Sequence, residues 1–340
     1  MNDTPENDVV PDGNTTGSEG KPIDPIDKFA ELPDAPPKRG IRLTWVGKIA
    51  VTIVAAWVLI AIFGPWIAPY HEAEFIVDDG FLPAGACMEI TEEIYDLDEM
   101  TPAAIEQYCS TSETALVLGA DYIGRDTLSR VIWGARTTIG ISFFSTMVAY
   151  FLGITMGIAA AVRGGWTDMV LSRVNESILS LPSIMLGLIA VAALGSSIPI
   201  LISVASVIYA TSVYRIARAL GQDIMVQDFV EAAHARGEGL WWIITREVLP
   251  NAAMPLATDF GLRLVFVILF ISSLSFLGLG VQPPMSDWGS MVRENMAGLG
   301  YGSYASIWPA LAIASLTISI NLIVDDISAK AGGSLAKKMV

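Results

Sequence analysis

The sequence predicts an all-α integral membrane protein with six transmembrane helices, and two observations lead to this prediction. The chain of 340 residues is 53% hydrophobic and only 16% charged, which is too apolar for a typical soluble domain. Its apolar residues also form long runs without Asp, Glu, Lys or Arg, and a spanning helix needs about 20 such residues. The alternative, a large soluble protein with buried helices, rarely contains such runs. They cover residues 49–70, 137–162, 177–214, 264–286 and 295–324.

The first span is expected at residues 44–68, after a polar N-terminal tail at residues 1–40. The acidic tail is rich in Asp, Glu, Pro, Gly and Asn, so it has too little apolar surface to fold alone and is expected to be disordered. It lacks the basic start and apolar core of a signal peptide. Lys38, Arg39 and Arg42 precede the span, and the positive-inside rule therefore places the N-terminus in the cytoplasm. A tail that binds a partner is the alternative.

Residues 70–117 are expected to form an acidic extracytoplasmic loop. Residues 70–114 contain twelve acidic residues and no Lys or Arg, which agrees with a location outside. This segment also contains the two cysteines of the chain, Cys87 and Cys109. Two cysteines in such a loop predict a disulfide bond, and a pair of unpaired thiols is the alternative.

Five more spans are expected in the rest of the chain. The run 177–214 is long enough for two of them, with Gly195–Pro199 as the turn between them and Pro182 as a kink. Thr127–Arg136 is expected to form a short amphipathic helix, whose arginines would pair with the acidic loop or with lipid phosphates. A C-terminal tail at 329–340 contains lysines that keep it inside. The five spans are expected at about 138–162, 174–194, 200–220, 256–281 and 306–324.

A charged stretch, Glu231–Asn251, separates the apolar segments around it and reads EAAHARGEGLWWIITREVLPN. Its first part is expected to be a short helix, which Gly237 and Gly239 end. Leu240–Val248 is expected to form a second helix, which Pro250 closes. The pattern predicts a helix–turn–helix at a membrane surface, and an ordinary amphipathic interfacial hairpin is the alternative.

Four motifs carry a resemblance to one family. Residues 231–250 resemble the EAA loop of ABC importer permeases. The stretch LGADYIGRD at 118–126 and the residues after it, SLSFLGLGVQPP at 273–284 and SDWGSM at 286–291 resemble the C-type permease subunit of dipeptide, oligopeptide and nickel importers. The resemblance extends over 118–326. The chain departs from the pattern of this family at three places. Ala120 stands where the family usually has Thr, and Ile271 stands where many relatives have Glu. The residues at 321–326 also differ from the pattern of the relatives.

The resemblance implies a type I ABC importer permease fold over residues 118–328, with 70–117 as an insertion. It also implies a permease subunit of an ATP-driven, binding-protein-dependent importer of peptides or peptide-like solutes, in a bacterial or archaeal cell membrane (the inner membrane in a Gram-negative cell). The implied partners are a second, B-type permease, two ATPase subunits that hold ATP and Mg, and an extracytoplasmic solute-binding protein. Membrane lipid surrounds the chain. No cofactor in this chain and no nucleic acid are expected.

The resemblance also assigns roles to particular residues. The loop 231–250 is expected to couple the permease to the ATPase subunits, with Ala232 and Ala233 leaving one helix face small enough for another protein to approach. The serines near 273–284 either line the pathway or bond to their own helix backbone. The expected coupling residues are Glu231, Ala232, Ala233, Gly237, Leu249 and Pro250, and the possible pathway residues are Ser272, Ser273 and Ser275.

Other classes of function have less support in the sequence. There is no GxxxxGK[ST] phosphate-binding loop, no HExxH and no metal-ligand cluster, so no catalytic or metal residue is assigned. A membrane enzyme would need acid–base residues that converge within the bilayer. A secondary transporter would show an internal repeat and charges at the midplane, and neither is visible. The solute stays open among dipeptides, longer peptides, opines, glutathione and nickel complexes.

Overall fold

The computed structural model of this protein describes a single structural unit that begins at Leu43. The expected tail at 1–40 and most of the acidic segment lie outside the described residues. So do Cys109 and the side chain of Cys87, and the predicted disulfide bond therefore lies outside them as well. The described residues are 43–77, 80–87 and 115–336.

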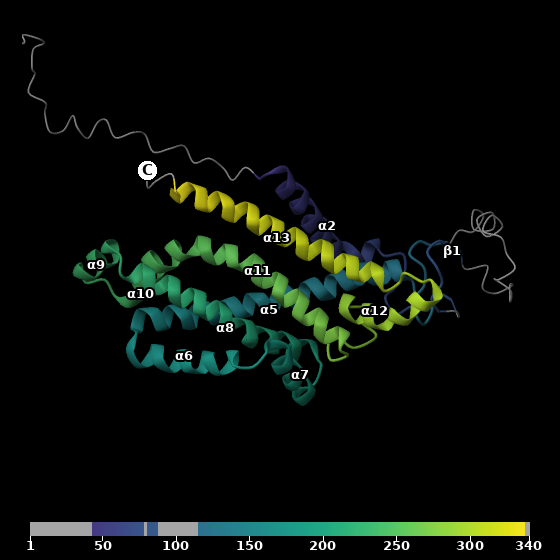
Figure 1. Ribbon diagram of the computed structural model, residues 1–340, viewed down its shortest axis with the longest axis horizontal. Helices are drawn as coiled ribbons and strands as arrows, with labels where there is room; N and C mark the ends of the chain where they lie inside the picture. Colours follow the sequence, from purple (N-terminus) through teal and green to yellow (C-terminus); the bar gives the residue numbers. More distant parts are fainter. Residues whose placement is uncertain (1–42, 78–79, 88–114, 337–340) are drawn as a thin grey trace, which may run out of the picture. The chain divides into compact units, whose positions relative to one another are not determined.

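The described chain is almost entirely helical (Figure 1). Two strands of two residues, β1 (Ala86–Cys87) and β2 (Ala115–Leu116), pair antiparallel. The α-helices are α2 (Trp45–Ile67), α5 (Thr127–Arg163), α6 (Gly165–Leu179), α7 (Ser183–Leu194), α8 (Ile198–Met225), α9 (Asp228–Ala235), α10 (Leu240–Ile243), α11 (Leu249–Phe276), α12 (Trp288–Glu294) and α13 (Ile307–Ala336). A π-helical turn, η2 (Ile244–Val248), and a 3-10 helix, η3 (Met296–Tyr301), complete the list.

Figure 1 shows the long helices running between two ends of this unit. We call the end that carries α9 and α10 the loop end, and the end that carries β1, α12 and η3 the cap end. The backbone N–H of Thr44, which precedes α2, donates to Asp326 of α13 over 2.9 Å and joins the start of α2 to α13. At the cap end the N–H of Tyr70 donates to the hydroxyl of Ser129 at the start of α5 over 3.1 Å.

Five helical segments are long and apolar enough to cross a membrane, or up to six if the bent pair α6–α7 counts as one span. The bend in this pair is 87°. The expected span at 174–194 is therefore broken, because Pro182 stands outside both helices and precedes α7 as its N-cap. The sequence prediction of a kink at Pro182 has the right position but underestimates the bend.

The helix expected at 127–136 does not stand alone. It continues without a break into the span expected at 138–162, so that α5 is 37 residues long. The side chain of Asp126 accepts a hydrogen bond from the N–H of Ser129 over 2.7 Å and caps the helix start. No glycine or proline interrupts the helix between residues 127 and 133, so nothing in the local sequence ends it.

Helices α5 and α8 make the most extensive contact between any two elements. Small residues allow it, because Gly157 of α5 lies directly against the backbone of α8. A Cβ atom on Gly157 would lie 2.7 Å from the carbonyl oxygen of Tyr214 and 2.8 Å from the Cβ of Ala217. Membrane helices pack closely through such small residues, since lipid gives no hydrophobic drive for their association.

Replacing Gly157 with leucine is expected to destabilise the protein by about 1–3 kcal/mol, because the larger side chain forces the two helices apart. The measurement is thermal unfolding in detergent. Gly140→Leu on the same helix is the control, since a Cβ atom at Gly140 meets no atom within 4 Å. Equal melting temperatures for the two variants would contradict this account of the α5–α8 contact.

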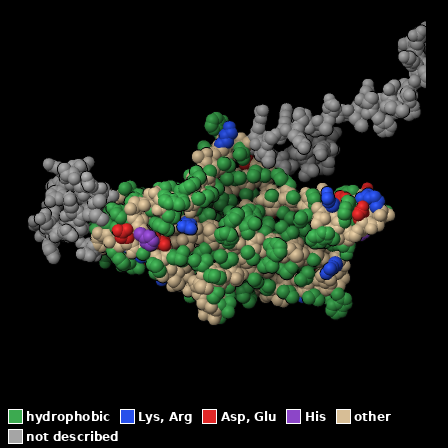
Figure 2. Space-filling model, turned by 180° about the vertical axis from the view of Figure 1, so that it is seen from behind, with side chains coloured by type: hydrophobic (Ala, Val, Ile, Leu, Met, Phe, Trp, Pro, Cys, Tyr) green, Lys and Arg blue, Asp and Glu red, His purple; other side chains and the backbone are tan. Residues whose placement is uncertain are grey.

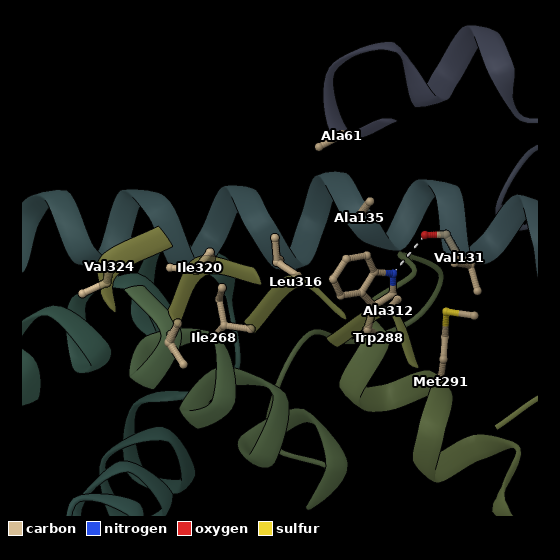
Figure 3. Packing of buried hydrophobic residues seen from close by; sticks show 11 residues of the cluster. Ala61, Val131, Ala135, Ile268, Trp288, Met291, Ala312, Leu316, Ile320 and Val324 are labelled. Atoms are coloured by element: carbon tan, nitrogen blue, oxygen red, sulfur yellow. Dashed lines mark hydrogen bonds between the residues drawn. The ribbon is translucent and has the colours of Figure 1, made fainter. Parts of the chain in front are cut away.

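A second packing centre surrounds Trp288 of α12 near the cap end (Figure 3). Its indole N–H donates to the carbonyl oxygen of Val131 over 2.9 Å, and Trp57 of α2 meets its ring edge-on with centroids 4.9 Å apart. Buried residues from α5, α11 and α13 close around the ring. These contacts hold the short helix α12 between three long helices and α2.

Many large hydrophobic side chains between the two ends are exposed. Figure 2 shows hydrophobic side chains over the middle of one face, with most charged side chains toward its margins. Helix α2 is an extreme case, since only 17% of its most apolar window is buried inside the protein. Exposed patches of this size mark contact with lipid or with other proteins.

Candidate functional site

The candidate site is the helix–turn–helix at the loop end, which we call the coupling loop (Asp228–Pro250). Its first helix, α9, is anchored by one face. Val230 and Ala233 are fully buried and belong to one apolar cluster with Ile158 of α5 and Ala217 of α8. This apolar contact sets the orientation of α9 relative to the spanning helices.

The opposite face of α9 is exposed and carries Asp228, Glu231, Ala232 and Ala235. The two acidic residues lie in the first turn, where negative charge is favourable beside the free N–H groups of the helix. Two alanines leave the rest of this face nearly flat. The face is therefore small, acidic and held rigid from behind, which suits close contact with another protein surface.

The turn after α9 depends on Gly237. Its φ angle is +81°, in the left-handed region that glycine adopts without strain. The N–H of Glu238 donates to Ala233 over 3.2 Å, and the N–H of Gly237 donates to His234 over 2.9 Å. This pair of bonds is the Schellman pattern that ends helices. The sequence prediction that Gly237 ends the first helix agrees with this geometry.

The prediction that Pro250 closes the second helix is wrong. The chain is helical without interruption from Leu240 to Phe276. The π-helical turn Ile244–Val248 makes this possible, since the N–H of Leu249 bonds to the carbonyl of Ile244, one residue further back than in an α-helix. The widened turn leaves room for the proline ring, and the amide of Asn251 donates to the carbonyl of Glu247 over 2.6 Å.

The structure separates the expected coupling residues into two groups. Glu231, Ala232, Gly237, Leu249 and Pro250 are exposed. Ala233 was expected to share the small outward face, but its side chain is fully buried in the protein's own core. The sequence gives no sign of this, because either alanine can face inward until the position of α5 and α8 is known.

The three serines expected near a pathway have different surroundings. Ser272 and Ser273 line a hollow of about 550 Å³ between α11, α12 and α13. The hydroxyl of Ser272 has no hydrogen-bond partner in the described part of the chain, whereas that of Ser273 donates to the carbonyl of Leu269 over 2.6 Å. Ser275 is buried, does not line this hollow and accepts a bond from the N–H of Val281 over 3.4 Å. Its contacts stabilise a turn and do not favour a pathway role.

A buried charge cluster, which the sequence analysis did not foresee, joins the segments at the cap end. Arg130 contacts Asp121 at 2.5 Å and Glu294 at 3.2 Å, and Arg125 contacts the same two acids at 2.7 and 3.4 Å. The expected pairing of these arginines with the acidic loop or lipid is thus replaced by pairing with Asp121 and Glu294. The four-residue spacing of Asp121 and Arg125 is a signal for their pair, but Glu294 lies 164 residues from Arg130.

Asp287 begins α12 beside this cluster. Its carboxylate accepts from the N–H of Ser290 over 3.0 Å and from the hydroxyl of Thr138 over 2.9 Å. Complete burial raises the pKa of Asp287 above its ordinary value, and the hydrogen bonds oppose this shift. Because the folded pKa lies above that of the unfolded chain, Asp287 by itself adds stability as the pH falls.

Replacing Asp287 with alanine is expected to cost about 2 kcal/mol, since α12 loses its cap and Thr138 loses a partner. Asp287→Asn keeps the cap and removes the buried charge, so we expect a smaller loss. Melting temperatures of both variants in detergent test this. As the pH is lowered from 7 to 5, the melting temperature of Asp287→Asn should also fall relative to that of the unmodified chain. Equal losses in both variants would contradict the role of the cap.

Comparison with known proteins places this geometry in a family. Residues 149–329, more than half of the chain, match the model of the binding-protein-dependent transport system inner membrane component family. The chain is 31% identical over 208 residues to the glutathione transport system permease protein GsiD of Pectobacterium atrosepticum, covering 61% of this chain and 69% of that protein. It is 28% identical over 287 residues to the GsiD protein of Escherichia coli O6:K15:H31, covering 84% and 86%.

Two solved structures also resemble the chain. An inward-facing form of the MetNI methionine ABC transporter has a TM-score of 0.49 and 16% identity, covering 59% of this chain and 95% of the other. An amino acid ABC transporter with histidines has a TM-score of 0.46 and 15% identity, covering 58% and 92%. The match of the family model and the identity to the Pectobacterium permease carry the assignment. The chain belongs to the family of binding-protein-dependent transport system inner membrane components, the membrane permease subunits of ABC importers.

Proposed function

We propose that this chain forms half of the translocation pathway of an ATP-driven importer of peptides or peptide-like solutes, and that its coupling loop docks on an ATPase subunit. The observation that carries the proposal is the two-faced helix α9. One face is fixed to α5 and α8 through Val230 and Ala233, and the other is exposed, small and acidic. A partner protein that displaces the exposed face of α9 would therefore also displace the helices α5 and α8.

The backbone between the coupling loop and α11 would transmit this displacement. Gly237 and the turn after it connect α9 to a helix that is continuous from Leu240 to Phe276. A displacement of α10 therefore passes into α11 along one continuous helix. ATP binding would close the ATPase subunits, move the coupling loop and open the pathway on the other side of the membrane, and hydrolysis would reset it.

The proposal includes specific partners. A permease of this family acts with ATPase subunits and a solute-binding protein. We propose that two ATPase subunits supply ATP and Mg, and that a second, B-type permease completes the pathway. The exposed apolar surface of α6 and α7, with Trp166 78% and Ile189 65% exposed, is compatible with lipid or with that second permease.

The relatives support the solute class, and the charge distribution supports the orientation. The relatives named above are glutathione transport permeases, and glutathione is a peptide-like solute, which supports this class for the chain. We place the loop end in the cytoplasm because the ATPase subunits would meet it there. Both termini would then be cytoplasmic, which the basic residues before α2 support for the N-terminus and the lysines after residue 329 support for the C-terminus.

Reconstitution tests this function. The chain is purified with its co-produced permease and ATPase subunits and placed in lipid vesicles with the solute-binding protein. We expect peptide uptake that requires both ATP and the binding protein. Uptake by the chain without ATPase subunits would contradict the proposal and favour a secondary carrier.

A further inference from the structure

Two hollows between α6 and α8 meet at the same residues. The larger, of about 520 Å³, is lined by polar and charged side chains, among them Asn175, Glu176, Tyr214 and Arg215. The smaller, of about 200 Å³, is lined mostly by apolar side chains such as Met156 and Ile178, together with Asn175 and Tyr214. A water molecule occupies about 30 Å³ in the liquid, so the smaller hollow has room for a side chain.

The larger hollow is lined by a positive charge, that of Arg215, which has no ion-pair partner among the residues that the structure describes. Arg218 donates to both carboxylate oxygens of Asp168, one of them over 2.7 Å, and Glu176 is paired with Arg173 at 3.0 Å. Arg215 makes no ion pair with any described residue. It belongs to α8, which is long and apolar enough to span a membrane. Arginines in such helices face a cavity or a partner group, because lipid does not solvate their charge.

Asn175 is a second group that lacks a partner. Only 7% of the residue is exposed, and its side chain makes no hydrogen bond with any described residue. Buried amides in proteins almost always have partners. The amide of Asn175 offers two N–H donors at the junction of the two hollows. The neighbouring hydroxyls are occupied with each other, as Ser172 and Tyr214 lie 2.9 Å apart.

We propose that these two hollows bind the C-terminal residue of a peptide-like solute, with its carboxylate at Arg215 and Asn175 and an apolar side chain in the smaller hollow. This rests on the proposed function. A carboxylate accepts hydrogen bonds only, and it matches the planar fork of an arginine. The apolar neighbour hollow distinguishes such a residue from a small free anion, which would leave that space empty.

The experiment uses the complete reconstituted importer and two peptides of the same sequence, one with a free C-terminal carboxylate and one with a C-terminal amide. For each peptide, the uptake rate with a variant is divided by the rate with the unmodified chain, which cancels the preference of the binding protein. Arg215→Gln is expected to lower this ratio about tenfold for the free acid and less than about twofold for the amide. Arg215→Lys is expected to restore most of the free-acid uptake, since the charge returns.

Arg163→Gln is the matched control, because Arg163 is exposed at the end of α5 and lines neither hollow. Its two ratios should both stay near one. Equal losses for acid and amide in Arg215→Gln, or no loss for either, would overturn the proposal. If neither peptide enters with the unmodified chain, the proposed function fails and this inference fails with it.

A phospholipid headgroup is the other source of an anion, and a second measurement separates it. Mass spectrometry of the purified complex counts the anionic phospholipid that remains bound. The proposal predicts the same amount in the unmodified chain and in Arg215→Gln. Loss of bound lipid in Arg215→Gln together with unchanged uptake ratios would assign the hollows to lipid and overturn the peptide site.

Discussion

Replacing Ala232 with tryptophan is expected to weaken ATPase docking roughly thirtyfold or more while leaving the fold intact. Ala232 is exposed on the small face of α9, so a large ring there blocks close approach without touching the core. Loss of a central contact in a protein interface costs about 2 kcal/mol or more, which is roughly thirtyfold in the dissociation constant. The measurements are co-purification with the ATPase subunits, ATP-driven uptake and the melting temperature in detergent.

The neighbouring residue supplies the matched control. Ala233→Trp places the same ring on the buried face of the same helix, against Val230 and the residues of α5 and α8. We expect it to lower the melting temperature by overpacking, whereas Ala232→Trp should melt like the unmodified chain. An Ala232→Trp variant that binds the ATPase subunits and imports at the normal rate would exclude this face as the docking site.

Replacing Arg130 with alanine is expected to destabilise the protein by about 3–5 kcal/mol. The guanidinium contacts Asp121 and Glu294, and both carboxylates have side chains less than 10% exposed. Its removal leaves two buried acids with only Arg125 to balance them, and an uncompensated buried charge is costly. Thermal unfolding in detergent measures the loss, and we expect the cap end to lose its structure first.

An exposed ion pair in the same chain is the control for this prediction. Arg173 and Glu176 form an ion pair at 3.0 Å, but their side chains are 79% and 63% exposed. Arg173→Ala should therefore cost less than about 1 kcal/mol. The double variant Arg130→Met, Glu294→Leu removes one charge of each sign, so it should be more stable than Arg130→Ala. A loss in Arg130→Ala no larger than that in Arg173→Ala would show that the cluster adds little.

The loop end shows how far local sequence determines structure. The turn at Gly237 follows from the sequence, because a left-handed φ angle is a property of one residue and its neighbours. At Pro250, by contrast, the local sequence does not predict the structure. Proline ends helices in general, but the π-helical turn before it absorbs the missing N–H and the ring, and the helix continues to Phe276. Sequence reasoning did not foresee that turn.

The cap end shows a second limit. The arginines at 125 and 130 were expected on the outer side of the membrane, where they could pair with the acidic loop or with lipid phosphates. Their partner Glu294 comes from a helix more than 160 residues later in the chain. Only the packing of α12 against α5, through Trp288 and Val131, brings that carboxylate within reach. A long-range ion pair of this kind has no signature in one sequence.

The sequence by itself determined the membrane class, the approximate spans, the charged loop between them and the family, because each depends on local hydrophobicity or on a short motif. Only the tertiary structure decided which alanine of α9 faces the core, where the chain bends between α6 and α7, and which carboxylates neutralise Arg125 and Arg130. The physical reason is the same in each case. Burial and charge pairing depend on what lies across space from a side chain, and that is set by how the helices pack and not by the neighbours along the chain.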